Sequence, residues 1–386
     1  MQHSHITHPK NILLIQSGDI GDVVLTTPTI RAVKETHPHA RVSVLVLEPF
    51  GSLLLADPNI YEVIETARIR GSLFRRLKTF LGLARTLYKK HYDLAINLRT
   101  GDRGALLAFS TRAKHRIGCQ GVKKQFWHQF LFTSILRGLK VAPPPVHPGA
   151  DQSLRVVRKL GIDTADSMPK LYIAPNDKIR AVSLLAKTGI SPGEKIITIN
   201  PFSRWKYKEW SQEKWGEVID RIWETYRIPT VLIGSAEEAA ANREISTGRE
   251  SYTFNLAGET SLGELAATLA LSTLHLGVDS AAPHIAAALG TPTVTIHGPS
   301  DWRAWRIVNA HHKVISQTMD CLPCNKTGCN GSGKSQCLDD LTAVPVIRAA
   351  FELLGETLNY SVLSFPRRRE PSQIKQLDAR LRGHDE

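Results

Sequence analysis

The chain twice repeats an alternation of apolar strand patterns and helical patterns. In the first stretch, residues 11–16 form an apolar run, residues 23–35 have helical spacing, and residues 41–47 form a second apolar run. Strand, helix and strand in this order make a βαβ unit, which requires a parallel sheet. Residues 93–98 read as a further strand, and the chain is therefore predicted to be an α/β protein.

The same alternation restarts near residue 195. The second stretch is predicted to hold strands at 195–200, 229–234, 274–278 and 291–297 and helices at 211–226, 262–272 and 281–289. Two similar halves that meet between residues 165 and 190 imply a central cleft. Ligands of open α/β sheets lie beyond the carboxyl ends of the strands, so polar loops of both halves should face one crevice.

Length and composition agree with two domains in the cytoplasm. The chain has 386 residues, 42% of them hydrophobic, enough for two cores. It has no run of eighteen apolar residues that would predict a membrane-spanning helix, and residues 1–8 do not resemble a signal peptide. We predict a disordered lead at 1–9, an N-terminal domain at 10–175, a C-terminal domain at 176–360, and a basic disordered tail at 361–386.

The net charge of +13 favours anionic partners, which include nucleic acid, phosphorylated substrates and anionic membranes. A non-catalytic nucleic-acid-binding protein is an alternative function. The chain lacks the sequence signatures of common nucleic-acid-binding modules, and part of its positive charge lies in the tail.

The loop after the first strand reads S-G-D-I-G-D, from Ser17 to Asp22. Glycines permit close backbone approach, and free amides at a helix start attract anions. A carboxylate there would repel phosphate, so Asp22 fits a general base better. The spacing differs from G-x-G-x-x-G, which argues against a dinucleotide cofactor. Alternatively, Asp22 serves only as the cap of the following helix.

Two loops of the second half have the composition of a diphosphate site. Arg204, Lys206 and Lys208 follow a strand, and together they can clamp a diphosphate or form a solvated basic turn. Asp279 and Ser280 precede a helix of small residues, whose first amides can bind phosphate. The alternative for this segment is a tightly packed interior helix capped by Asp279.

Together these three segments resemble the lipopolysaccharide core heptosyltransferases, glycosyltransferase family 9, over roughly residues 11–355. The resemblance implies a GT-B fold of two Rossmann-like domains, with the acceptor on the first and the nucleotide sugar mainly on the second. It implies metal-free, inverting transfer of heptose from ADP-heptose to the lipopolysaccharide inner core, at the inner face of the inner membrane. The layout is most similar to the third, branch-adding heptosyltransferase type, and another nucleotide sugar is the alternative donor.

The resemblance also implies roles for individual residues. Asp22 matches the catalytic base, Lys208 the lysine that neutralises the diphosphate, and Asp279 the carboxylate that binds the sugar. A second carboxylate at Asp19 leaves two candidates for the base. The remaining donor-site candidates are Ser203, Arg204, Glu237 or its neighbour Glu238, Ser280, Ala281 and His284, and those of the acceptor side are Asp19, Gly21, Lys123 and Lys124.

Residues 68–90 combine eight cations, among them Arg75, Arg76, Lys78, Arg85, Lys89 and Lys90, with apolar residues at helical spacing. This pattern suits a helix that lies on an anionic lipid surface, or a helix that packs its apolar side on its own domain. Residues 123–132 form a second basic and aromatic run, which is expected to line the side of the lipid acceptor.

Four of the five cysteines form a C-x2-C-x4-C-x7-C cluster. Its members, Cys321, Cys324, Cys329 and Cys337, could hold a structural zinc ion tetrahedrally. The spacing differs from common two-knuckle zinc sites, so a reduced loop and a local disulfide are alternatives. No metal is expected in catalysis.

Overall fold

The computed structural model describes residues 8–68, 72–121, 126–139, 147–305, 307 and 309–355. Its first half is a parallel sheet in the order β3-β2-β1-β4-β5-β6. The strands are β1 (Asn11–Gln16), β2 (Arg41–Leu47), β3 (Glu62–Thr66), β4 (Leu94–Asn97), β5 (His115–Cys119) and β6 (Ser134–Leu136). The helices of this half are α1 (Ile20–Thr36), α2 (Leu73–Lys89), α3 (Asp102–Ser110), α4 (His128–Leu131) and α5 (Pro148–Arg158).

The second half is another parallel sheet, in the order β12-β11-β10-β7-β8-β9. Its strands are β7 (Ile197–Asn200), β8 (Thr230–Leu232), β9 (Thr253–Asn255), β10 (Leu274–Val278), β11 (Thr293–Ile296) and β12 (His312–Ile315). Its helices are α6 (Pro175–Lys187), α7 (Gln212–Tyr226), α8 (Ala239–Ser246), α9 (Leu262–Leu271), α10 (Ala281–Ala288), α11 (Gln336–Asp339) and α12 (Val344–Leu354). Counted from the start of each half, both sheets have the Rossmann strand order.

The predicted α/β class is confirmed, and the central strands follow from the sequence pattern. Residues 12–15 of β1 are fully buried, as expected for a parallel strand covered by helices on both faces. The predicted strands at 41–47 and 274–278 have the observed bounds. Strands β3, β5, β6, β9 and β12 were not predicted, because they are short and their polar residues interrupt the apolar runs.

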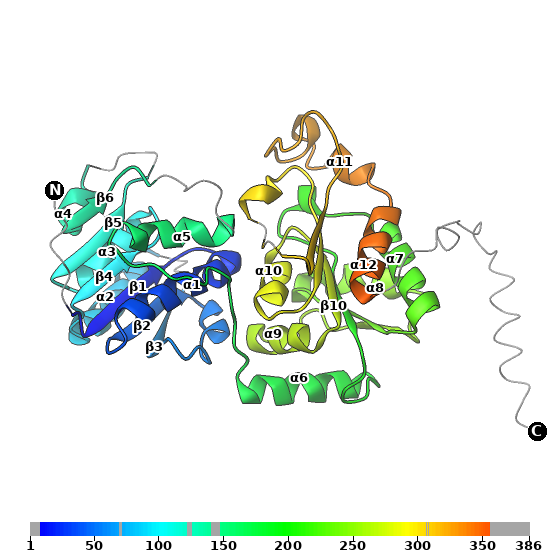
Figure 1. Cartoon of the computed structure of the whole chain (residues 1–386), viewed down its shortest axis with the longest axis horizontal. Coiled ribbons are helices and arrows are strands. Elements are labelled where there is room, and N and C mark those ends of the chain that lie inside the picture. The colour runs from blue at the N-terminus through cyan, green and yellow to red at the C-terminus, as the bar shows by residue number, and fades with distance from the viewer. Residues whose placement is uncertain are drawn as a thin grey trace, which may run out of the picture.

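The two halves contact each other through α1 and α10 (Figure 1). The backbone amide of Leu171, in the segment between the halves, donates a hydrogen bond of 3.0 Å to the carbonyl of Ala288 at the end of α10. Helix α6 packs on α9 of the second half. The starts of α1 and α10, where ligands of such sheets bind, are thereby brought together.

Several predictions fall on residues that the structure does not describe. These are residues 1–7, Lys123, Lys124 and the tail from residue 356. Within the described residues, no helix is both long enough and apolar enough to span a bilayer.

Helix α12 closes the second core through Phe351, which is fully buried and lies edge-on to Tyr226 with ring centroids 5.1 Å apart. Replacing Phe351 with Ala should lower the free energy of unfolding by about 3–5 kcal/mol, because it removes apolar contacts and leaves a cavity. Urea denaturation followed by circular dichroism measures this. The control Ile179→Ala, at a position that is 67% exposed, should change the value by less than about 0.5 kcal/mol.

Candidate active site

The loop between β1 and α1 is shaped by contacts that require particular residues. The buried Gln16 accepts a hydrogen bond of 3.1 Å from the Gly18 amide and donates one of 2.6 Å to Thr26 Oγ1. A Cβ atom at Gly18 would lie 2.3 Å from Asp22 Oδ2, so only glycine lets the Asp22 carboxylate fold over the loop.

Asp22 has both a structural contact and an ionic one. Its Oδ2 accepts a hydrogen bond of 3.0 Å from the Asp19 amide, whereas the N-cap residue of α1 is Asp19 and not Asp22. Its Oδ1 pairs with Arg99 Nη1 at 2.8 Å, and the side chain is 16% exposed. The alternative that Asp22 only caps the helix is therefore incomplete, because one oxygen faces a cation outside the helix.

Arg99 was not predicted as a site residue. Arg99 follows β4, which pairs with β1 in a parallel sheet. Because neighbouring parallel strands end at the same edge of the sheet, the sequence pattern could have placed Arg99 near the loop after β1. The strand pattern at 93–98 located the strand but did not single out the cation after it.

Asp19 connects the two halves. Its Oδ1 forms an ion pair with Arg68 of the first half, and its Oδ2 lies 3.0 Å from Arg204 Nη2 of the second half. Burial alone would raise the pKa of Asp19, but the bonds from Arg204 and Arg68 outweigh it and lower the pKa. Arg204, predicted to clamp a diphosphate, is thus paired with a residue of the first half in this structure.

In the second half, Asp279 and Lys208 form a largely buried ion pair. Lys208 Nζ lies 2.7 Å from Asp279 Oδ2, with side-chain exposures of 20% and 11%. Burial opposes the charge of Asp279, but His297, Lys208 and a hydrogen bond from Ser300 together lower its pKa to about 2. Asp279 is therefore an anion at neutral pH.

Ser280, rather than Asp279, is the N-cap residue of α10, and Ala281 is the first residue of the helix. The Ser280 hydroxyl donates a hydrogen bond of 2.6 Å to Asn200 Oδ1, which joins the last residue of β7 to the loop after β10. These two strands are neighbours in the second sheet. The predicted residues Lys208, Asp279, Ser280 and Ala281 thus lie at its switch point.

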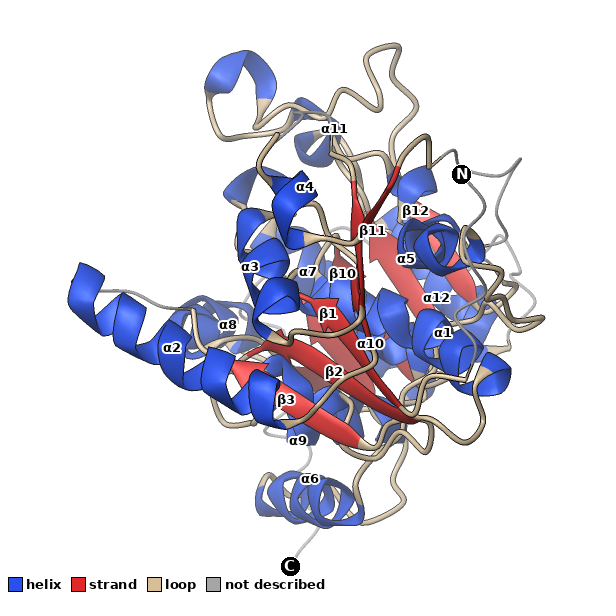
Figure 2. Ribbon diagram, turned by 90° about the vertical axis from the view of Figure 1, so that its left-hand side faces the viewer, coloured by secondary structure: helices blue, strands red, loops and turns tan. Residues whose placement is uncertain are grey.

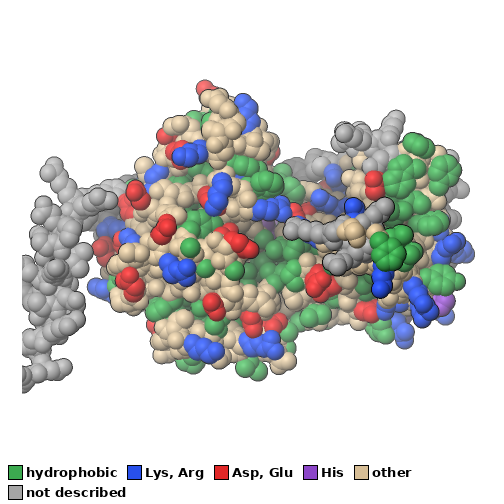
Figure 3. Space-filling model, turned by 180° about the vertical axis from the view of Figure 1, so that it is seen from behind, with side chains coloured by type: hydrophobic (Ala, Val, Ile, Leu, Met, Phe, Trp, Pro, Cys, Tyr) green, Lys and Arg blue, Asp and Glu red, His purple; other side chains and the backbone are tan. Residues whose placement is uncertain are grey.

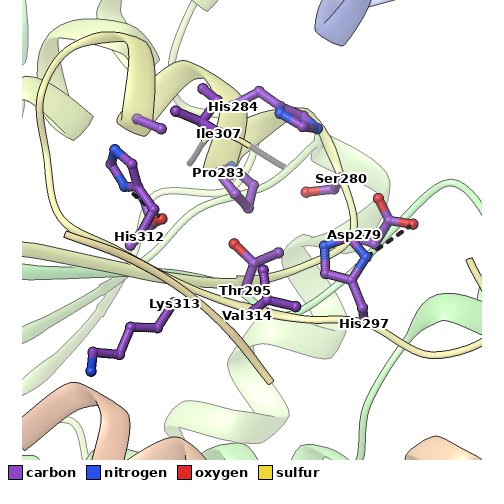
Figure 4. A pocket seen from close by; sticks show the side chains of 12 residues that line it. Asp279, Ser280, Pro283, His284, Thr295, His297, Ile307, His312, Lys313 and Val314 are labelled. Carbon is purple, nitrogen blue, oxygen red and sulfur yellow. Dashed lines mark hydrogen bonds and ion pairs between the residues drawn. The ribbon is translucent and has the colours of Figure 1, made fainter. Parts of the chain in front are cut away.

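Two histidines, the partly exposed His284 and the buried His297, stand beside this group (Figure 4). His284, on α10, was predicted, and burial lowers its pKa. His297 was not predicted: its Nδ1 lies 3.9 Å from Asp279 Oδ2, and burial lowers its pKa to about 4, so the ring is neutral at pH 7. A small cavity below the start of α10 is lined by Ser280, His284, His297 and Thr295.

The remaining donor-side candidates differ in burial. Ser203 is buried, and its amide donates a hydrogen bond of 3.1 Å to Glu209. Glu237 is exposed, whereas Glu238 is partly covered and accepts a hydrogen bond of 2.7 Å from the Ser235 amide. Burial raises the pKa of Glu238. The charges of Glu209 and Lys206 also influence this pKa, so Glu238 lies close to the basic loop.

The cysteine loop does not form a metal site in the part of the chain that the structure describes. All four cysteines are free thiols, and no three His, Cys, Asp or Glu side chains are grouped around a common point. Cys337 is buried, which raises the pKa of its thiol to about 11, with Cys329 and Cys324 adding to the shift. The thiols are unpaired in this arrangement, and a structural ion at this loop stays a prediction.

Two Rossmann-like halves with carboxylates and cations at facing switch points are the architecture of the GT-B class of glycosyltransferases. Residues 80–334 match glycosyltransferase family 9 (heptosyltransferase). This match covers well over half of the 386 residues, and the chain belongs to that family. The predicted fold class, enzyme class and family are confirmed, and a non-catalytic nucleic-acid-binding protein is not favoured.

Individual relatives agree with this assignment. Lipopolysaccharide heptosyltransferase 3 of Escherichia coli (strain K12) is 29% identical over 293 residues, covering 74% of this chain and 82% of that protein. The crystal structure of the glycosyl transferase family 9 from Veillonella parvula DSM 2008 has a TM-score of 0.77 at 25% identity, over 90% of this chain and 98% of that one. The fold is also that of E. coli ADP-heptose lps heptosyltransferase II, with a TM-score of 0.71 at 23% identity over 89% and 98% of the chains.

The lowered pKa of Asp279 predicts a pH dependence of stability. Because the folded pKa of about 2 is below the ordinary 3.8, the contribution is present above about pH 4 and is lost as the pH falls through about 2. Between pH 5 and pH 3 the native chain should lose about 1 kcal/mol more unfolding free energy than Asp279→Asn. Urea titrations at both pH values test this, and parallel losses in the two proteins would contradict it.

Proposed function

We propose that this enzyme transfers heptose from ADP-heptose to the inner core of lipopolysaccharide, with inversion at the anomeric carbon. One observation carries the proposal: Asp22, at the start of α1, faces the Lys208–Asp279 ion pair near the start of α10. The approach is close, since a Cβ atom at Gly21 would lie 3.6 Å from His284 Cδ2. Membership of a heptosyltransferase family supports heptose as the sugar, and the similarity to E. coli ADP-heptose lps heptosyltransferase II supports ADP-heptose as the donor.

In this proposal, the diphosphate of the donor lies at the start of α10. The amides of Ser280 and Ala281 point to its oxygens, and Lys208 and Arg204 neutralise its charge. Asp279 accepts hydrogen bonds from sugar hydroxyls beside Lys208, with His284 and Ser203 completing the pocket. Glu237 or Glu238, which flank the basic loop, would contact the ribose.

The chemical step places the acceptor hydroxyl between Asp22 and the anomeric carbon. Its oxygen attacks that carbon from the side opposite ADP, the bond from carbon to the diphosphate oxygen breaks, and the hydroxyl proton passes to Asp22. ADP leaves with the bonding electrons, and the fixed cations and helix amides stabilise its growing charge. Lysine, arginine and amides supply this stabilisation without a divalent ion.

The acceptor is proposed to bind the first half, where Arg68, Arg99 and Arg103 lie near Asp19 and Asp22. Arg99 holds Asp22, and Arg103 is anchored to Thr66 Oγ1 at 2.8 Å. These guanidinium groups suit an anionic acceptor, and Gly21, Lys123 and Lys124 are the further candidates on this side. The third, branch-adding type is the form we favour, given the similarity to heptosyltransferase 3.

We place the reaction at the cytoplasmic face of the inner membrane. A lipid-anchored core acceptor would be met there, and a protein of net charge +13 is attracted to an anionic leaflet. A different nucleotide sugar would use the same diphosphate contacts, so direct comparison of ADP-heptose with other nucleotide sugars tests the identity of the donor.

Replacing Asp22 with Asn should lower kcat by at least about 10²–10⁴-fold, because the amide cannot take the hydroxyl proton. The affinity for ADP, measured by calorimetry, should change by less than about twofold, since Asp22 belongs to the acceptor half. Asp19→Asn is the matched comparison. A larger loss of kcat in Asp19→Asn than in Asp22→Asn would assign the base to Asp19.

Transfer should proceed in the presence of EDTA, because Lys208, Arg204 and the α10 amides stabilise the leaving diphosphate. Initial rates with and without the chelator measure this. A rate that collapses in EDTA and returns with magnesium would overturn this part of the mechanism. A slow decline that only zinc reverses would instead indicate a structural ion at the cysteine loop.

A further inference from the structure

Exposed apolar side chains are concentrated on one helical layer of the first half. Helices α2, α3 and α4 cover the same face of the first sheet, where their inner residues form one core cluster (Figure 2). Seven of the twelve large apolar residues exposed among the described residues belong to these helices and the turn before α4. They are Phe74, Leu77, Leu81, Tyr88, Leu106, Phe126 and Phe130.

Helix α2 has two apolar sides. Phe80, Leu83 and Leu87 pack on the core of the first half. Phe74, Leu77, Leu81 and Tyr88 lie within about 60° of one another around the helix, at about 100° per residue, and are 79%, 53%, 56% and 54% exposed. Packing on its own domain therefore accounts for only one side of this helix, and the second side is left in solvent.

Cations border the exposed stripe. Three exposed cations flank the stripe on the side of the helix that faces away from the core: Lys78, Arg85 and Lys89. The sequence of α2 has no Asp or Glu. Figure 3 shows hydrophobic side chains gathered with Lys and Arg side chains on the first half, at the right of the view. A protein partner of mixed charge would be repelled in part, whereas an anionic lipid surface matches both the charge and the apolar stripe.

The layer of α2, α3 and α4 is linked to the carboxyl edge of the first sheet, where Asp22 lies. Arg103, at the start of α3, donates hydrogen bonds to Thr66 Oγ1 and the Ala67 carbonyl at the end of β3. The adjacent Arg68 reaches Asp19 in the loop before α1. A membrane lying against the layer would therefore border the acceptor side of the site.

We propose that the outer face of α2, α3 and α4 docks on the surface of an anionic bilayer. The aromatic and leucine side chains enter the interface, and Lys78, Arg85 and Lys89 contact the lipid headgroups. Docking in this orientation would present Asp22 to a lipid-anchored acceptor, and this consequence rests on the proposed function. The binding itself does not depend on which sugar is transferred.

The test compares full-length variants in co-sedimentation with vesicles of equal parts phosphatidylglycerol and phosphatidylethanolamine. Phe74→Ser/Leu81→Ser should weaken vesicle binding at least about tenfold. The matched control, Leu55→Ser/Ile179→Ser, removes two apolar residues of similar exposure (66% and 67%) outside the layer and should bind within twofold of the native chain. The basic tail is present in every protein and contributes equally.

A second pair of variants tests the charges. Lys78→Gln/Lys89→Gln should weaken binding to the anionic vesicles several-fold, and the effect should shrink as salt rises. Lys178→Gln/Lys187→Gln, on the exposed side of α6, should weaken it less than twofold. Equal effects of the two pairs would show that net charge alone drives binding and would overturn the docking surface.

Transfer to a lipid-free core oligosaccharide separates this proposal from the proposed function. The Phe74→Ser/Leu81→Ser variant should keep the native rate on that acceptor, which also shows that it is folded, and should lose rate on the acceptor embedded in vesicles. Vesicle binding equal to that of the native chain would refute the docking surface. A native chain that transfers heptose to neither acceptor would refute the proposed function and leave the vesicle result standing.

Discussion

The contact between the first turns of α1 and α10 is the constraint on which the site depends. Both sheets have the same strand order, so each has a single switch point at which loops diverge, after β1 and β4 in one half and after β7 and β10 in the other. The approach of Gly21 to His284 brings the two switch points together. Groups from four separate loops thereby face a common space.

Charge pairing organises that space before any ligand is considered. Asp22 is paired with Arg99, Asp19 with Arg68 and Arg204, and Asp279 with Lys208. Each carboxylate is held in a fixed position by its cation, and the pair between Asp19 and Arg204 crosses from one half to the other. An anionic substrate would meet guanidinium and ammonium groups whose positions are already set, which reduces the cost of ordering them on binding.

The two faces of the first sheet have different surroundings. One is covered by α1 and α5, with α1 in contact with α10 of the second half. The other is covered by α2, α3 and α4, which together with the turn before α4 carry seven of the twelve large apolar residues exposed among the described residues. A single parallel sheet thus separates the face that meets the second half from the face that we propose meets the bilayer, while Asp22 lies at its carboxyl edge.

The sequence by itself determined the central strands, the glycine loop at Gly18 and the candidates Asp22, Lys208 and Asp279, because these features are local: apolar runs, turn residues and polar groups in the segments between a strand and the next helix. The tertiary structure alone decided the partners of these residues. Arg99 is 77 positions from Asp22, and Arg204 is 185 positions from Asp19. It also decided that α2 buries one apolar side and exposes another. Periodicity can show that a helix has apolar positions, but burial depends on which neighbours the fold brings against them.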